Sequence, residues 1–143
     1  MKIMFVCTGN TCRSPMAEVI FKNMNCDVDV SSAGIFALTG SNASSEAIEI
    51  CNSHGLDLSC HKSRNIADSN INEMDLILTA TLEHANLLKR SYPNLNVYSI
   101  KEYAGVYEDF DIKDPICGGL SDYEECFLEI RDALENIADN LNF

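Results

Sequence analysis

A cysteine and an arginine with five residues between them stand near the start of the chain, in a segment that reads VCTGNTCRSPMAE from Val6 to Glu18. The cysteine is Cys7 and the arginine is Arg13. An arginine side chain presents a planar fork of donors that matches two phosphate oxygens. A cationic neighbour and a helix N-terminus favour the thiolate form of a cysteine. A thiolate directed into an anion-binding loop is a nucleophile for phosphoryl transfer, and this spacing predicts that chemistry.

The loop needs a strand before it and a helix after it, and the flanking pattern predicts both. Residues 2–6 (KIMFV) are typical of a short buried strand, which the Thr-Gly-Asn turn ends. From Pro15 to about Met24 the pattern becomes helical, with Ser14 as the expected N-cap. In open α/β sheets, ligands bind at the carboxyl ends of strands, where backbone N–H groups of such a turn can cradle an anion. A nucleotide-binding Walker A loop is excluded, because no Gly-Lys-Ser/Thr follows Gly9.

The rest of the chain alternates between strand-like and helix-like segments. Strands are expected over residues 28–32, 75–79 and 97–100, and helices over residues 43–54, 82–91 and 122–140. This alternation predicts an α/β fold. We expect a single domain spanning residues 1–143, a three-layer sandwich with a four-stranded parallel sheet flanked by helices. Residues 104–120 form the longest irregular stretch, and loops of that length in a compact domain are often functional.

Composition and charge narrow the function classes. With 143 residues and a net charge of -12, the chain lacks the basic surface that nucleic-acid binding requires. Its seven cysteines include no Cys-X-X-Cys pair and no zinc-ligand spacing, which argues against a disulfide framework or a structural metal. The first residues lack the apolar core of a signal peptide, and no run of 18 apolar residues occurs. We therefore expect a cytoplasmic protein without membrane contact.

The segment VCTGNTCRSPMAE resembles the signature loop of the low-molecular-weight protein tyrosine phosphatases and of their close relatives, the bacterial protein arginine phosphatases. Ser32-Ala33-Gly34 is similar to the family's Ser-Ala motif, and Asp114-Pro115 is similar to its general-acid loop. The resemblance covers essentially the whole chain. It implies a metal-independent and cofactor-independent protein phosphatase that releases inorganic phosphate from a phosphorylated protein or peptide.

The resemblance also implies the roles of individual residues. Cys7 would attack phosphorus to give a cysteinyl-phosphate that water then hydrolyses, while Arg13 and the loop amides carry the transition-state charge. Asp114 would protonate the leaving group and then activate the water, although Asp109 and Asp111 are rivals in the same acidic loop. Substrate binding is expected from the loop residues Thr8, Gly9, Asn10, Thr11, Cys12 and Ser14.

Two roles are possible for several residues in or near this loop. Ser14 could donate to the thiolate as well as cap the helix. Asn10 tolerates left-handed backbone geometry, and the resemblance implies that Ser32 and His61 brace it. His61 could equally be a surface histidine. Cys12 could form a reversible disulfide with Cys7 that protects the nucleophile from over-oxidation, or it could simply fill the loop.

Position 11 favours one substrate class. Tyrosine-specific members of the family usually carry a bulky aliphatic residue there, whereas Thr11 resembles the arginine phosphatase branch. Thr81 replaces the acid that tyrosine-specific relatives often place after the third strand. Residues 116–119 (ICGG) lack the paired aromatics that sandwich phosphotyrosine, although Ile116 departs from both branches. The prediction is phosphoarginine, with phosphotyrosine as the alternative.

Two further functions are less compatible with the sequence. Arsenate reductase shares the first loop but needs two additional cysteines after the third strand, and residues 78–90 (LTATLEHANLLKR) contain none. A catalytically inactive phosphopeptide-binding module would not need to retain Cys7, Arg13 and Asp114 together.

Overall fold

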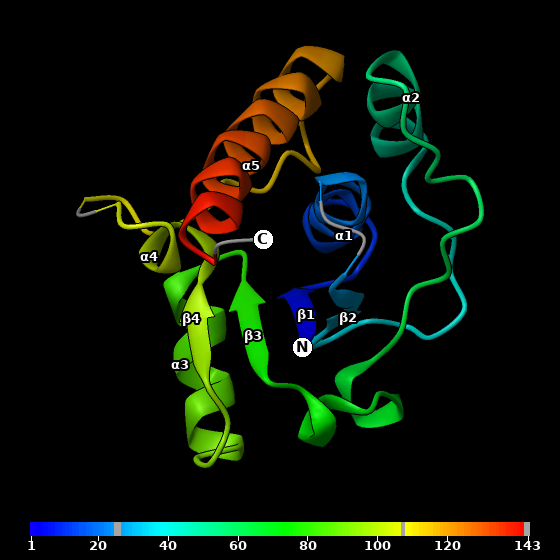
Figure 1. Cartoon of the computed structure of the whole chain (residues 1–143). Helices are drawn as coiled ribbons and strands as arrows, with labels where there is room; N and C mark the ends of the chain where they lie inside the picture. Colours follow the sequence, from blue (N-terminus) through cyan, green and yellow to red (C-terminus); the bar gives the residue numbers. More distant parts are fainter. Residues whose placement is uncertain (25–26, 107, 142–143) are drawn as a thin grey trace.

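Four parallel strands form the centre of the computed structural model, which describes residues 1–24, 27–106 and 108–141. The strands are β1 (Lys2–Cys7), β2 (Asp29–Gly34), β3 (Leu76–Thr79) and β4 (Val97–Ser99). Their order across the sheet is β2-β1-β3-β4, and every neighbouring pair is parallel. The predicted four-stranded parallel sheet is confirmed (Figure 1).

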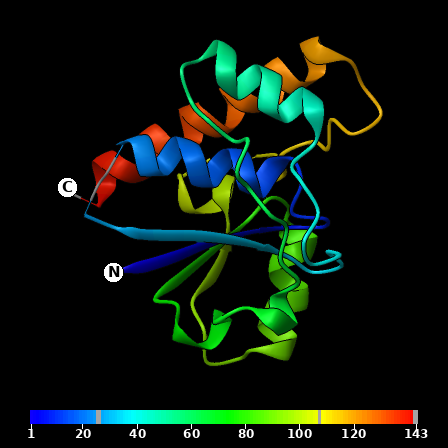
Figure 2. The same cartoon turned by 90° about the vertical axis from the view of Figure 1, so that its right-hand side faces the viewer.

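Helices cover both faces of this sheet. They are α1 (Arg13–Met24), α2 (Ser45–Ser53), α3 (Leu82–Ser91), α4 (Ile100–Tyr103) and α5 (Leu120–Asn140), and two short 3-10 helices span Ile66–Asp68 and Ile71–Glu73. Figure 2 shows the sheet edge-on, with α1, α2 and α5 on one side and α3 on the other. This is the three-layer arrangement that the sequence predicts. Within the described residues, no helix is both long and apolar enough to span a membrane.

The side chains of strand β1 alternate between the two faces of the sheet, and this alternation sets the direction of the Cys7 side chain. Ile3, Phe5 and Cys7 pack in the core between the sheet and α1 and α5. Met4 and Val6 pack in the opposite core, against α3. Because successive side chains of a strand point to opposite faces, Cys7 emerges on the α1 side of the sheet.

Two local expectations are wrong. Helix α1 begins at Arg13 rather than Pro15, because the backbone N–H of Met16 already donates to the carbonyl oxygen of Cys12 at 3.1 Å. Ser14 is therefore inside the helix and is not its N-cap. Ile100 does not extend the last strand but opens α4, where Ser99 and Glu102 form a capping box.

The other elements agree with the predictions to within a few residues. Helix α3 has the predicted bounds, β2 ends at Gly34 rather than at residue 32, and α5 begins two residues before the predicted start. Residues 104–119 contain no helix or strand among the described positions, as the sequence predicts.

Candidate active site

The thiol of Cys7 lies at the carboxyl end of β1 and is 2% exposed. Its Sγ is 2.9 Å from Oγ of Ser14, and the backbone N–H of Asn10 donates to it at 3.3 Å. Both contacts suit a thiolate, which accepts hydrogen bonds from N–H and O–H donors. Since Ser14 is in the first turn of α1, the positive end of the helix dipole lies next to the same sulfur. Strand end, loop and helix start thus surround one reactive atom.

Asn10 holds the loop in its shape from behind. Its backbone φ of 57° lies in the left-handed region, which asparagine tolerates better than most residues. Its Nδ2 donates to Oγ of Ser14 at 2.8 Å and to Oγ of Ser32 at 3.0 Å, and its Oδ1 accepts from the backbone N–H of Arg64 at 2.9 Å. Nε2 of His61 donates to the carbonyl oxygen of Asn10 at 2.8 Å. The structure therefore places both expected supporting residues, Ser32 and His61, against Asn10.

Gly34 allows β2 to lie directly under the loop. A Cβ at this position would stand 2.7 Å from the carbonyl oxygen of Thr8 and 2.9 Å from the backbone nitrogen of Asn10. The next two residues also bind the loop, because the N–H groups of Ile35 and Phe36 donate to the carbonyl oxygens of Cys7 and Thr8. The Ser32-Ala33-Gly34 segment thus ends at a position where any residue other than glycine would displace the backbone of the loop.

Arg13 links the loop to the irregular stretch before α5. Its side chain is nearly buried, and Nη1 donates to the carbonyl oxygen of Ile112 at 2.9 Å. Nη2 lies 3.4 Å from Oδ2 of Asp114, whose side chain is 41% exposed. The other carboxylate oxygen, Oδ1, accepts from the N–H of Ile116 at 3.0 Å. The guanidinium and the carboxylate therefore meet at one edge of the loop.

The two alternative general acids, Asp109 and Asp111, have hydrogen-bond or ion-pair partners outside the pocket. Oδ1 of Asp111 accepts from the N–H of Leu82 at 2.8 Å and so caps the first turn of α3. Asp109 is largely exposed and pairs with Nζ of Lys101 at 3.4 Å. Of these three carboxylates, the one that lines the pocket above Cys7 is Asp114.

A pocket of about 120 Å³ opens above the thiol of Cys7. It is lined by Cys7, Thr8, Gly9, Thr11, Cys12, Arg13, Asp114 and Ile116. Most of the expected binding residues are thus brought together. Asn10 and Ser14 are instead buried beneath the loop, where their side chains support its backbone.

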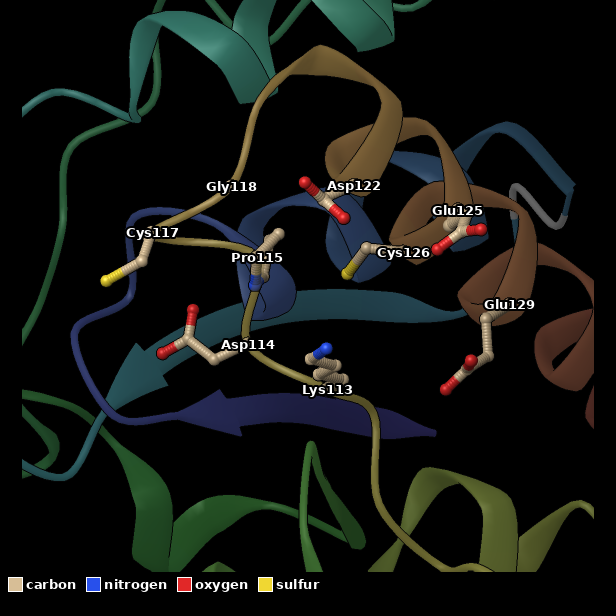
Figure 3. A pocket seen from close by; sticks show the side chains of 9 residues that line it. All are labelled: Lys113, Asp114, Pro115, Cys117, Gly118, Asp122, Glu125, Cys126 and Glu129. Carbon is tan, nitrogen blue, oxygen red and sulfur yellow. The ribbon is translucent and has the colours of Figure 1, made fainter.

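A larger cavity, of about 300 Å³, lies on the other side of Asp114 (Figure 3). Its walls carry Lys113 and Pro115 from the acid loop and Asp122, Glu125 and Glu129 from α5. Neither Cys7 nor Arg13 lines it. The smaller pocket is therefore the one that combines Cys7, Arg13 and Asp114.

Two side chains that contact the loop were not anticipated from the sequence. Nε2 of His84, in the first turn of α3, is 2.9 Å from Oγ1 of Thr8, and burial lowers the pKa of His84 to about 4, helped by the nearby Arg13 charge. The hydroxyl of Tyr123, on α5, is 3.4 Å from Sγ of Cys12, and burial raises the pKa of Tyr123. Tyr123 packs in the core on the α5 side of the sheet, and its hydroxyl links that helix to the loop.

Two expected participants in substrate choice occupy different places. Thr11 lines the pocket, and its Oγ1 is 3.8 Å from Sγ of Cys12. Thr81 is the N-cap of α3, and its hydroxyl accepts from the N–H of His84 at 3.1 Å.

Cys7 and Cys12 are both free thiols, and Sγ of Cys12 donates to Oγ of Ser44 at 3.4 Å.

Comparison with known proteins agrees with this geometry. Residues 2–142 match the family described as low molecular weight phosphotyrosine protein phosphatase. The low molecular weight protein-tyrosine-phosphatase PtpB of Staphylococcus haemolyticus is 40% identical over 131 residues, which cover 91% of this chain and 92% of PtpB. The protein-arginine-phosphatase of Bacillus subtilis is 33% identical over 147 residues, which cover 99% and 97% of the two chains.

The fold is similar to that of solved members as well. A structure of the YwlE arginine phosphatase, a cysteine-to-serine mutant with a phosphorylated active site serine, superposes with a TM-score of 0.92 at 33% identity. The alignment covers 99% of this chain and 95% of that one. The chain therefore belongs to the low molecular weight phosphotyrosine protein phosphatase family and is a cysteine-dependent phosphatase.

Proposed function

We propose that this phosphatase hydrolyses phosphoarginine in proteins or peptides, with Cys7 as the nucleophile. The observation that carries the substrate class is Thr11, a small polar side chain in the wall of the pocket above Cys7. A branched aliphatic residue at this point would offer an apolar surface to a phenyl ring. A threonine leaves room, and a hydroxyl, beside a charged phosphoguanidinium group.

The proposed reaction proceeds in two displacements. Sγ of Cys7 attacks phosphorus, the P–N bond to the guanidinium breaks, and Asp114 transfers its proton to the leaving nitrogen. Asp114, now a carboxylate, then accepts a proton from water as the water oxygen attacks phosphorus and the S–P bond breaks. Inorganic phosphate leaves and the thiolate is restored. The phosphorylated active site serine of the YwlE mutant supports covalent phosphoryl transfer to this position of the loop.

The electrostatic part of the reaction falls to Arg13 and the loop amides. The phosphoryl oxygens carry most of the charge in such transition states, so preorganised donors around them lower the barrier. Arg13 is preorganised because the carbonyl oxygen of Ile112 holds one guanidinium nitrogen in place while the loop lies beneath it. Its 3.4 Å approach to Asp114 keeps cation and proton donor on the same side of the pocket.

Phosphotyrosine is the second candidate substrate. PtpB, a tyrosine phosphatase, is 40% identical to this chain, and the arginine phosphatase of Bacillus subtilis is 33% identical. Ile116 lines the pocket with 62% of its surface exposed, and an apolar side chain there can pack against an aromatic ring.

A comparison of kcat/KM for a phosphoarginine peptide and a phosphotyrosine peptide tests the proposal. The enzyme should prefer phosphoarginine, and Thr11→Ile should shift the ratio toward phosphotyrosine by about tenfold or more. Thr11→Val is the matched control, because it keeps the shape of threonine and replaces the hydroxyl with a methyl group. A preference for phosphotyrosine in both the wild type and Thr11→Ile would overturn the substrate assignment. Phosphate release that survives Cys7→Ser would overturn the covalent mechanism.

A further inference from the structure

His84 is a buried titratable side chain that the proposed reaction does not use. It is 8% exposed and sits in the first turn of α3, next to the phosphate-binding loop. Nε2 is 2.9 Å from Oγ1 of Thr8, a residue that lines the pocket above Cys7. The other ring nitrogen, Nδ1, is buried and has no hydrogen-bond partner in the part of the chain that the structure describes.

Two contacts hold the start of α3, the helix turn that carries this ring. The hydroxyl of Thr81 accepts from the backbone N–H of His84, and Asp111 accepts from the N–H of Leu82. Asp111 belongs to the same irregular stretch as Asp114. Through Asp111 and the contact of His84 with Thr8, this helix turn therefore links the stretch that carries Asp114 to the loop that carries Cys7.

The surroundings of the ring decide which nitrogen carries the proton. A neutral imidazole has one N–H, and burial together with the Arg13 charge keeps His84 neutral at physiological pH. A proton on Nδ1 would be a buried donor without an acceptor among the described residues. A proton on Nε2 instead donates to Oγ1 of Thr8 and leaves no buried N–H unpaired.

We propose that His84 is a positioning residue for phosphate binding: its Nε2–H donates to Oγ1 of Thr8, which frees the Thr8 hydroxyl hydrogen to donate to an oxygen of the bound phosphoryl group. A threonine hydroxyl has a single hydrogen, so an acceptor at Nε2 would consume it and a donor at Nε2 releases it. The inference rests on the proposed phosphatase site and concerns the phosphoryl group, which phosphoarginine and phosphotyrosine share.

Inorganic phosphate is the probe, measured as a competitive inhibitor of p-nitrophenyl phosphate hydrolysis. Thr8→Val should weaken phosphate inhibition by about tenfold, the usual effect of one hydrogen bond to a charged group. His84→Leu should weaken it by a smaller factor, because the Thr8 hydroxyl keeps its hydrogen but loses the donor that orients it. The double variant should be no weaker than Thr8→Val alone. His84→Gln, whose amide can donate to Thr8, should recover most of the loss. His54→Gln is the matched control, since Nε2 of His54 pairs with Glu124 on α5 and should leave phosphate inhibition unchanged.

A purely structural role for His84 predicts a different pattern. His84→Leu would then reduce phosphate affinity by the same factor in the Thr8→Val background as in the wild type, and that result would overturn the proposal. An ¹H–¹⁵N spectrum of the wild-type histidine ring gives a test that needs no variant: the proton must be found on Nε2, and a proton on Nδ1 would refute the inference. The Cys7→Ser experiment tests the phosphatase site separately, so the two proposals can fail independently.

Discussion

Replacing Asn10 by alanine tests how strongly its side chain stabilises the loop of residues 7–13. The side chain makes three hydrogen bonds, donating to Ser14 and Ser32 and accepting from the N–H of Arg64. Each contributes about 0.5–1.5 kcal/mol net. Alanine at a φ of 57° adds roughly 1–2 kcal/mol of backbone strain. Asn10→Ala should therefore lower the free energy of unfolding by about 2.5–6.5 kcal/mol, a large share of the roughly 5–15 kcal/mol that such domains possess.

Asn10→Gly separates the two contributions. Glycine loses the same three hydrogen bonds but adopts a positive φ without strain, so it should be about 1 kcal/mol more stable than the alanine variant. Ser32→Ala removes one of the three bonds and also the bond that Oγ of Ser32 donates to Glu18 at 2.6 Å, so it should cost about 1–3 kcal/mol. Asn10→Ala should therefore be the least stable of the three variants.

Urea unfolding followed by far-ultraviolet circular dichroism measures these values, since the chain contains no tryptophan. kcat/KM should fall in both Asn10 variants, because the backbone N–H that donates to Cys7 loses its support. The reasoning would be refuted if Asn10→Ala lowered the free energy of unfolding by less than about 1 kcal/mol. Equal stability of the alanine and glycine variants would refute it as well.

Three further substitutions probe other parts of the site. Gly34→Ala places a Cβ 2.7 Å from the carbonyl oxygen of Thr8 and should cost about 1–3 kcal/mol together with most of kcat/KM, whereas unchanged melting and activity would show that the loop can move aside. The folded-state pKa of His84, about 4, lies below the unfolded value, so the unfolded chain binds more protons and stability falls as the pH drops from about 6.5 to 4. This loss should reach about 3 kcal/mol at 1.4 kcal/mol per pH unit and be absent from His84→Gln, and identical pH dependence in the two proteins would contradict it. After peroxide treatment and thiol reduction, wild type should recover more activity than Cys12→Ser if Cys12 protects Cys7, and equal recovery would exclude that role.

The fold was largely accessible from the sequence because its strands are short apolar runs between turn residues. The wrong expectations lie where a side chain has a better partner than the local pattern suggests. Ser14 has the composition of an N-cap, yet its hydroxyl is bound to Cys7 and Asn10 and the helix starts before it. The capping box of Ser99 and Glu102 is visible as Ser-X-X-Glu, but a helix of four residues is too short to show a periodicity.

Some residues of the candidate site could likewise be predicted from the sequence, and others could not. Cys7 and Arg13 are separated by five residues, so their relation is local and readable. From the sequence, Asp114 could be preferred to Asp109 and Asp111 as the general acid only by resemblance to the family. In the structure, Asp111 accepts from the N–H of Leu82 and Asp109 pairs with Lys101, which distinguishes both from Asp114. His84 and Tyr123 contact the loop across 76 and 111 residues of sequence, and nothing in their own neighbourhoods points to it.

The two sides of the loop differ in how free their residues are to change. Behind the loop, Asn10 and Gly34 are fixed by hydrogen bonds and by backbone that leaves no space for a Cβ. In front of it, the side-chain hydroxyl of Thr11 makes only a long contact, 3.8 Å, with Sγ of Cys12 among the described residues, and Ile116 is largely exposed. Substitutions at exposed positions with few contacts usually alter stability little. The pocket wall can therefore change while the bracing of Cys7 and Arg13 stays intact, which explains how tyrosine and arginine phosphatases can resemble this chain at similar levels of identity.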